Sequence, residues 1–315
     1  MTEHAPLLEV RDLRVHFASE GNVVRAVDGV DFDLRAGETL ALVGESGCGK
    51  SSLARALVGL NPITSGAAQL NGRTITGLTR TAARAFRREL QLVFQDPYAS
   101  LNPRFTIAQT LAEPLLLHRK ASRSNVDSKV SELLGQVGLD PELRARYPHE
   151  FSGGQRQRIS IARALAVEPS LLLCDEVTSA LDVSIQAQIL ELLRSIQRTR
   201  GLSYLFITHD LGVVRYIAHR VAVMYVGQIV ELRDTESLFE SPAHPYTQAL
   251  LASIPRVSRA AQTRAPLPGE VPSPARPPSG CRFHPRCALA FDRCPKEHPD
   301  LYPVPNGSSR CFLNE

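Results

Sequence analysis

Short apolar runs separated by turns organise the start of the chain. Residues 7–17 are rich in β-branched and apolar side chains, and residues 27–34 alternate apolar with polar positions, so both stretches predict strands. Residues 39–43 form a wholly apolar run that ends in a glycine-rich turn. This pattern predicts a buried central strand that leads into a helix, which would begin at Lys50 and run through Leu57.

Helical periodicity replaces this pattern in the middle of the chain. Apolar positions recur at helical spacing in residues 106–117, 125–137 and 155–166. We therefore expect a mainly helical subdomain, at about 97–166, inserted into a sheet domain. Strands and helices alternate again after it, with strands expected at 91–94, 171–174, 203–207, 221–226 and 228–232 and helices at 185–197 and from 211. The whole pattern predicts an α/β fold.

Composition narrows the class of protein. The 315 residues are 43% hydrophobic and 22% charged, which is typical of a globular chain and argues against a mostly disordered or fibrous one. No apolar stretch approaches the ~20 residues that a membrane-spanning helix needs. The N-terminus lacks a basic segment followed by an apolar run, so we expect no secretion signal and any membrane association to come through a partner. A formal net charge of +4 without a basic block gives no support to nucleic-acid binding.

Four of the six cysteines crowd the C-terminal end, after a proline-rich stretch expected to be a linker at 256–280. They are Cys281, Cys287, Cys294 and Cys311. In a chain without a secretion signal, such a cluster favours metal ligation over disulfides. Four thiolates suit either a structural Zn²⁺ ion or a [4Fe–4S] cluster, and the alternative is four free thiols in a loose tail.

A glycine-rich segment lies between the predicted strand at 39–43 and the predicted helix. Its sequence is Gly44-Glu45-Ser46-Gly47-Cys48-Gly49-Lys50-Ser51, followed by Ser52. This spacing fits a phosphate-binding loop, in which backbone N–H groups and the helix N-terminus bind the β- and γ-phosphates of ATP. Lys50 would neutralise phosphate charge and Ser51 would offer its hydroxyl to Mg²⁺. The alternative is a chance glycine-rich turn.

Two acids follow the apolar run at 171–174. Buried carboxylates are costly unless they are paired or metal-bound, so Asp175 and Glu176 predict a functional site. Asp175 would hold Mg²⁺, mostly through water, and Glu176 would polarise the attacking water as a general base. Alternatively, the two acids only cap the next turn.

The segment Phe151-Ser152-Gly153-Gly154-Gln155 precedes the helix expected at 155–166. It resembles the signature sequence of ABC transporter ATPases, with Phe151 where a leucine is commoner. In that family, the serine and glycine N–H groups bind the γ-phosphate of ATP held by the opposite subunit. An ordinary serine N-cap would explain Ser152 but not the paired glycines.

Further residues match the same family in the expected order. Gln95 matches the Q-loop glutamine, which ligates Mg²⁺ and senses the membrane subunits, and residues 179–182, ending at Asp182, match the D-loop of the dimer interface. His209 matches the switch histidine that contacts the γ-phosphate, so the resemblance implies Glu176 and His209 as catalytic residues. Phe17 is our candidate for stacking on adenine, although it could equally be a core residue at a strand end.

Several phrases outside these motifs resemble the oligopeptide/dipeptide/nickel importers, and within them the second of two paired ATPases. They are residues 94–103, 244–247, 269–274 and 277–281. The resemblance implies a P-loop NTPase (RecA-like) core with an antiparallel β subdomain, an inserted helical subdomain and a small Cys-rich extension. It places a nucleotide-binding domain at 1–255, the linker at 256–280 and the extension at 281–315. It also favours an iron–sulfur cluster over zinc.

The same resemblance implies the partners and the location. We expect a second ABC ATPase subunit, two transmembrane permease subunits and an extracytoplasmic solute-binding protein, at the cytoplasmic face of the cell membrane. Peptide is the leading solute, with nickel, glutathione or another small solute as alternatives. A soluble ABC ATPase of translation or DNA repair and a metal-responsive regulator are rivals from other classes. Because the cysteines lie far in sequence from the predicted ATP-site residues, we expect any metal centre to be structural.

Overall fold

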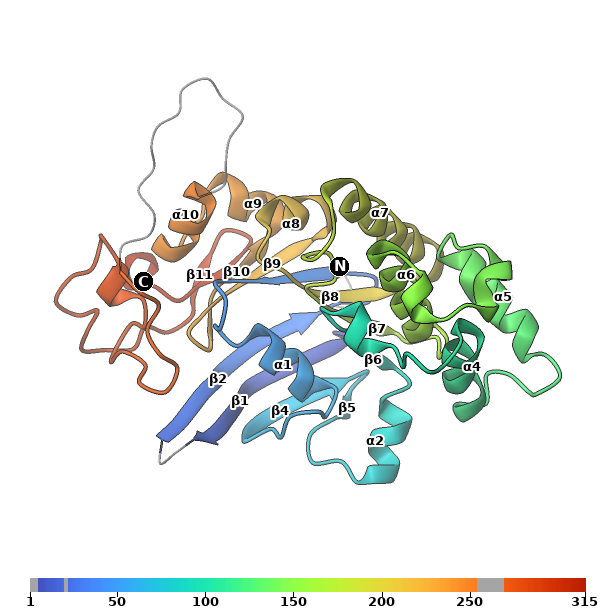
Figure 1. Cartoon of the computed structure of the whole chain (residues 1–315). Helices are drawn as coiled ribbons and strands as arrows, with labels where there is room; N and C mark the ends of the chain where they lie inside the picture. Colours follow the sequence, from blue (N-terminus) through green and yellow to red (C-terminus); the bar gives the residue numbers. More distant parts are fainter. Residues whose placement is uncertain (1–4, 20–21, 254–268) are drawn as a thin grey trace, which may run out of the picture. The chain divides into compact units, whose positions relative to one another are not determined.

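The computed structural model describes residues 5–19, 22–253 and 269–315 (Figure 1). The chain divides into two compact units. Unit 1 is Met1–Gly77 with Ile207–Glu315, and unit 2 is Leu78–Phe206. Of the predicted linker at 256–280, residues 256–268 lie outside the described residues.

Unit 1 contains an antiparallel sheet and part of a mixed sheet. The antiparallel sheet has the order β2-β1-β4-β5, with β1 Leu8–Ser19, β2 Asn22–Leu34, β4 Ser65–Leu70 and β5 Arg73–Thr74. The other strands follow the order β11-β12-β10-β9-β3, with β3 Thr39–Val43, β9 Arg220–Tyr225, β10 Gln228–Asp234, β11 Tyr302–Val304 and β12 Gly307–Ser309. β3 is buried at every position and pairs in parallel with β9, as a wholly apolar run predicts.

The helices of unit 1 are short. They are α1 Lys50–Leu57, α8 Leu211–Ile217, α9 Thr235–Glu240 and α10 Pro245–Ala252, with 3₁₀ turns at His284–Arg286 and Phe312–Asn314. The C-terminal segment, orange to red in Figure 1, adds β12 to the edge of β10. Phe283 of this segment is buried in one core cluster with Val43, Val223 and Tyr246. The segment is therefore part of the folded core of unit 1.

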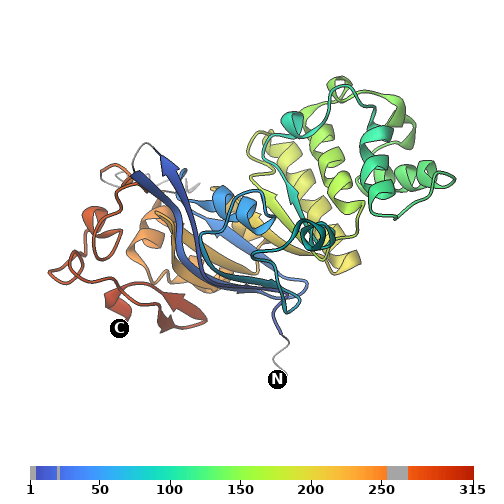
Figure 2. The ribbon, with the colours of Figure 1, turned by 90° about the horizontal axis from the view of Figure 1, so that it is seen from below.

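Unit 2 contains the strands β6 Leu90–Val93 and β7 Leu171–Asp175 and, up to Phe206, the strand β8 Ser203–Ile207, in the order β8-β7-β6. Its helices are α2 Arg80–Phe86, α3 Pro97–Ser100, α4 Ile107–Leu117, α5 Val126–Gln136, α6 Gly153–Leu165 and α7 Val183–Arg200, with 3₁₀ turns at Pro141–Ala145 and Pro148–Glu150. Helices α4, α5 and α6 pack against one another and form the green cluster of Figure 2.

Most elements expected from the sequence are confirmed. The strand at 39–43, the helix from Lys50 to Leu57 and the strand at 203–207 have the predicted bounds, and the other expected strands and helices are present with ends shifted by a few residues. The short strands β4, β5, β11 and β12 and the helices α2, α3 and α9 are additions to the prediction. Among the described residues, no helix is both long enough and apolar enough to cross a membrane.

Candidate functional site

The glycine-rich segment of unit 1 connects β3 to α1 in a conformation that needs glycine. A Cβ atom at Gly44 would lie 2.1 Å from the carbonyl oxygen of Met224, and one at Gly49 would lie 1.9 Å from that of Ala26. Gly49 is also the N-cap of α1, with φ 112°. Because glycine has no side chain to cap the helix, the first N–H groups of α1 are suited to bind an anion.

Lys50 is held inside this loop. Its side chain is buried, and Nζ donates hydrogen bonds to the carbonyl oxygens of Gly44 (2.8 Å) and Glu45 (3.0 Å). Ser51 and Ser52 follow it in the first turn of α1 and are half-buried. Burial raises the pKa of the neighbouring Cys48 thiol, which argues for a packing role of that side chain.

Two more predicted site residues belong to unit 1. Phe17 lies half-buried in β1, opposite Val24 of β2, and its role in binding adenine stays a prediction. His209 is exposed between β8 and α8. The flanking backbone is fixed, because Thr208 donates its N–H to the carbonyl oxygen of Leu42 (3.3 Å) and Asp210 caps α8.

In unit 2, the ends of two parallel strands bring a predicted pair together. β6 pairs with β7, with Val93 opposite Cys174, so Gln95 and Glu176 follow at the same edge. Gln95 Nε2 donates a hydrogen bond to Glu176 Oε2 at 2.9 Å. Asp175, at the end of β7, is buried. Glu176 has φ 49°, a left-handed conformation that costs a non-glycine residue about 1–2 kcal/mol.

The signature-like segment begins α6 with a capping box. The Ser152 hydroxyl accepts a hydrogen bond from the N–H of Gln155 (3.3 Å), and Gln155 Oε1 accepts one from the N–H of Ser152 (3.0 Å). A Cβ at Gly154 would lie 2.4 Å from Ile185 Cγ2, so packing against α7 explains that glycine. Gly153 is exposed and has no such contact closer than 3.6 Å. Ser152 is therefore the N-cap of α6, but neither capping nor packing explains why residue 153 is a glycine.

Asp182 belongs to the same unit. It is exposed at the N-terminus of α7, where its side chain forms no cap hydrogen bond. An exposed acid at a helix start suits a role at an interface, and its assignment to the D-loop stays a prediction.

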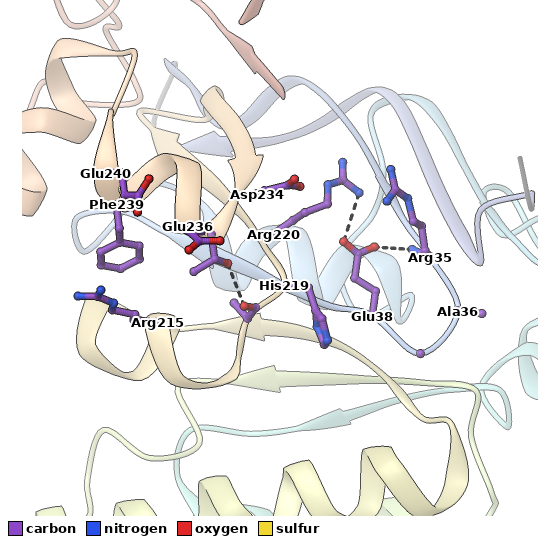
Figure 3. Close-up of a pocket in the computed structure, with 13 residues that line it drawn as sticks. Arg35, Ala36, Glu38, Arg215, His219, Arg220, Asp234, Glu236, Phe239 and Glu240 are labelled. Atoms are coloured by element: carbon purple, nitrogen blue, oxygen red, sulfur yellow. Dashed lines mark hydrogen bonds and ion pairs between the residues drawn. The ribbon is translucent and has the colours of Figure 1, made fainter. Parts of the chain in front are cut away.

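A separate cavity of about 720 Å³ in unit 1 shares no residue with the predicted site (Figure 3). Arg220 pairs there with Asp33 (3.0 Å) and Glu38 (3.4 Å), and the Arg215 guanidinium lies 5.7 Å from the ring centre of Phe239. Acidic residues of α9 also line the cavity. Because its cations are matched by acids, the cavity is a poor site for a triphosphate, and nucleotide binding by the glycine-rich loop stays the prediction.

The four C-terminal cysteines are free thiols that line one apolar pocket together with His284. Burial raises the pKa of Cys281 to about 11, and the nearby thiols of Cys311, Cys294 and Cys287 add to the shift. Within residues 5–19, 22–253 and 269–315, no set of three or more His, Cys, Asp or Glu side chains is arranged to hold a metal ion. The predicted metal centre is thus not present as a preformed single-ion site.

Sequence reasoning missed Arg286, which contacts the glycine-rich loop. It forms an ion pair with Glu45 (2.7 Å), and the Tyr246 hydroxyl accepts a hydrogen bond from the N–H of Glu45 (3.0 Å). Arg286 directly precedes Cys287, so the cysteine segment contacts the predicted phosphate-binding loop although the two lie far apart in sequence. The structural role expected of a metal centre stays a prediction. Residues 244–247 include Tyr246, which contacts Glu45, but in the sequence this stretch indicates only a family resemblance.

Comparisons with known proteins identify the family of the chain. Residues 27–179 match the ABC transporter family, and residues 230–294 match the oligopeptide/dipeptide transporter C-terminal region. A probable peptide ABC transporter ATP-binding protein of Sinorhizobium fredii is 54% identical, over 96% of this chain and 88% of that protein. The oligopeptide transport ATP-binding protein OppF of Escherichia coli is 50% identical, over 94% of this chain and 92% of that protein.

Solved structures show the same fold. A dimeric post-hydrolysis structure of the ATP-binding cassette MJ0796, bound to ADP and Pi, has a TM-score of 0.67 and 26% sequence identity, covering 72% of this chain and 98% of that one. The predicted P-loop NTPase fold with α/β sheets is confirmed. The chain is therefore an ABC transporter ATPase that belongs to the oligopeptide/dipeptide transporter family.

Proposed function

We propose that this chain hydrolyses ATP to power the uptake of oligopeptides or dipeptides, as a peripheral subunit on the cytoplasmic face of the cell membrane. The observation that carries the peptide assignment is the match of residues 230–294 to the oligopeptide/dipeptide transporter C-terminal region. Relatives that share about half of their residues with this chain are named as peptide transport ATP-binding proteins, which supports the same solute class.

In the proposed reaction, MgATP is bound by side chains with separate roles. Lys50 neutralises phosphate charge, while Ser51 and Asp175 hold Mg²⁺. Glu176 takes a proton from the attacking water. Gln95 orients the Glu176 carboxylate through the 2.9 Å hydrogen bond. Gln95 also contributes to Mg²⁺ binding, and His209 contacts the γ-phosphate. Neither catalytic residue is replaced, so the chain supplies a complete hydrolytic set.

We propose that a dimer completes the site, pairing this chain with a second ABC ATPase subunit. The Ser152–Gln155 segment of each subunit would bind the ATP held by the other, with Asp182 at the interface. The exposure of Ser152, Gly153 and Asp182 supports this role, because groups that act on a partner's ligand must face outward. Two permease subunits and an extracytoplasmic binding protein complete the importer.

The segment after Gln95 is our candidate for coupling to the permease. Tyr98 is 55% exposed on α3, and the Arg156 guanidinium lies 4.9 Å from its ring centre, which holds the ring at the surface. The Ser100 and Ser160 hydroxyls are 3.1 Å apart, which ties α3 to α6. An exposed aromatic on a supported turn is suited to receive an apolar helix of a permease subunit.

We further propose that the four cysteines hold a [4Fe–4S] cluster with a structural role. All four thiols line one apolar pocket, and sets of four cysteine thiolates hold [4Fe–4S] clusters, which is what supports this proposal. When bound, the cluster would cross-link the C-terminal segment. Protein purified without oxygen should contain iron and acid-labile sulfide in near-equal amounts. Colourless protein with stoichiometric zinc, or protein without metal, would refute this proposal.

Uptake measurements test the transport proposal. Cells that carry only the Glu176→Gln form should lose uptake of a labelled tripeptide and keep uptake of Ni²⁺, while cells with the parent form take up both. Loss of Ni²⁺ uptake with normal peptide uptake would overturn the peptide assignment. Unchanged uptake of both solutes, with the variant protein present at the parent level, would overturn the role in transport.

A further inference from the structure

An ion pair joins the C-terminal segment to the glycine-rich loop. Arg286 Nη1 lies 2.7 Å from Glu45 Oε2, and Nη2 lies 3.1 Å from Oε1, so the guanidinium and the carboxylate meet at two points. The Arg286 side chain is 5% exposed and the Glu45 side chain 25%. A two-point pair that is largely shielded from water fixes the orientation of both side chains.

Glu45 is also held through its main chain. Its N–H donates to the Tyr246 hydroxyl at 3.0 Å, and its carbonyl oxygen accepts from Lys50 Nζ at 3.0 Å and from the Cys48 N–H at 3.3 Å. Each of these bonds depends on where Glu45 sits. The ion pair with Arg286 therefore constrains the path of the whole loop around Lys50.

The segment that carries Arg286 is anchored by the residues just before the contact. The rings of Phe283 and Tyr225 form a T-shaped pair (ring centres 5.3 Å apart), and the Phe283 ring centre lies 5.4 Å from that of Tyr246. Arg282 donates hydrogen bonds to the Val226 carbonyl oxygen and to the Asp28 carboxylate. The backbone that carries Arg286 is thus held against the core, and Arg286 Nη1 itself lies 3.4 Å from the Tyr225 hydroxyl.

Charge gives this contact a consequence for nucleotide binding. Glu45 adds a negative charge to a loop proposed to bind a triphosphate, and like charges at close range oppose binding. Arg286 neutralises that carboxylate. We propose that Arg286 of the C-terminal segment is a positioning residue for ATP, which acts through Glu45 by fixing the phosphate loop and cancelling its negative charge. This inference rests on the proposed ATP-binding role of the loop.

Binding of mant-ATP and mant-ADP to the purified full-length chain, with Mg²⁺, tests the proposal. Arg286→Gln leaves the Glu45 carboxylate unpaired, so mant-ATP affinity should fall roughly tenfold, within the range of coupling between contacting residues. Mant-ADP affinity should fall less, because the missing phosphate carries part of the repelled charge. Adding Glu45→Gln to Arg286→Gln should restore mant-ATP affinity to within about threefold of the Glu45→Gln variant.

Arg293→Gln is the matched control. Arg293 lies in the same C-terminal segment and pairs with Glu297 (2.7 Å) and Glu315, but its side chain is 38% exposed and these partners lie outside the loop. Its removal should leave both affinities unchanged. Arg286→Lys keeps the charge without the two-point geometry and should show an intermediate loss of about threefold. If near-UV circular dichroism shows that Arg286→Gln does not fold, the mant-ATP affinity of Arg286→Lys is used to test the proposal instead.

Two results would overturn the inference. One is parent-like mant-ATP affinity in folded Arg286→Gln or, if that variant does not fold, in Arg286→Lys. The other is a double variant as weak as Arg286→Gln alone, which would show that the arginine acts through general packing. Failure of the ATP-binding proposal itself looks different, because Lys50→Ala would then bind mant-ATP as well as the parent does.

Discussion

Phe283 provides a test of whether the C-terminal segment belongs to the core of unit 1. Its side chain is 3% exposed. Its ring centre lies 5.3 Å from that of Tyr225, 5.4 Å from that of Tyr246 and 5.8 Å from that of His244. Replacing Phe283 with alanine removes all three contacts and leaves a cavity between the segment and the core. The free energy of unfolding of unit 1 should fall accordingly.

The expected loss follows from the burial and the ring contacts. A Phe→Ala change in a core typically costs about 3–5 kcal/mol. Aromatic pairs contribute about 0.5–1.5 kcal/mol each beyond the area they bury, which places Phe283→Ala near 4 kcal/mol. Since 1 kcal/mol shifts the melting temperature by roughly 2–4 °C in domains of this size, we expect a fall of about 8–16 °C.

Differential scanning calorimetry of the full-length protein measures this shift. Phe291→Ala is the matched control, because Phe291 lies in the same segment but is 44% exposed. The free energy of unfolding of this control should fall by about 1 kcal/mol or less. If Phe283→Ala melted within a few degrees of the parent, the segment would contribute little to the core, and the anchoring of Arg286 would lose its basis.

Three further predictions follow from single residues. Glu176→Gln removes the proposed base but keeps its shape, so ATP hydrolysis should fall by roughly 100-fold or more while mant-ATP still binds, measured with every site in the dimer carrying the change. Gly49→Ala places a Cβ 1.9 Å from the Ala26 carbonyl oxygen at a φ of 112°. The free energy of unfolding, measured by urea denaturation, should therefore fall by more than about 2 kcal/mol. Burial lowers the pKa of His244 to about 3, so this side chain is neutral in the folded protein and takes up a proton on unfolding below pH ~6.5. The contribution of neutral His244 to the free energy of unfolding is lost as the pH falls from ~6.5 toward 3, at up to about 1.4 kcal/mol per pH unit. His244→Asn keeps an acceptor for the Tyr246 N–H, and it should remove this pH dependence of the free energy of unfolding between pH 6.5 and 5.

Local pattern was sufficient for much of the fold. The strands at 39–43 and 203–207 are buried at every position, and such strands appear in sequence as unbroken apolar runs. The helix from Lys50 was predictable because a glycine-rich turn directly precedes it. These elements depend on neighbouring residues alone, so a single sequence contains their signal.

Other features depend on partners that lie far away in sequence. β11 and β12 are three residues each, too short for a periodic pattern. β12 forms by pairing with the edge of β10, and β11 forms by pairing with β12. Gly154 was read only as part of a phosphate-binding signature, whereas its lack of a side chain is also required by Ile185 of α7. The bond between Gln95 and Glu176 likewise needs β6 and β7 to be neighbours.

The contact between Arg286 and Glu45 changes how the cysteine segment has to be studied. Truncation after residue 280 would remove Phe283 and Arg286 together with the four cysteines. Loss of ATP binding in such a truncated chain would therefore say nothing about a cluster, because the ion pair and the core packing would be lost as well. Single Cys→Ser changes at Cys294 or Cys311 keep both anchors and remove only one proposed cluster ligand from the pocket lining. If these variants bind mant-ATP like the parent while Arg286→Gln does not, the C-terminal segment serves the nucleotide site through its arginine and not through its thiols.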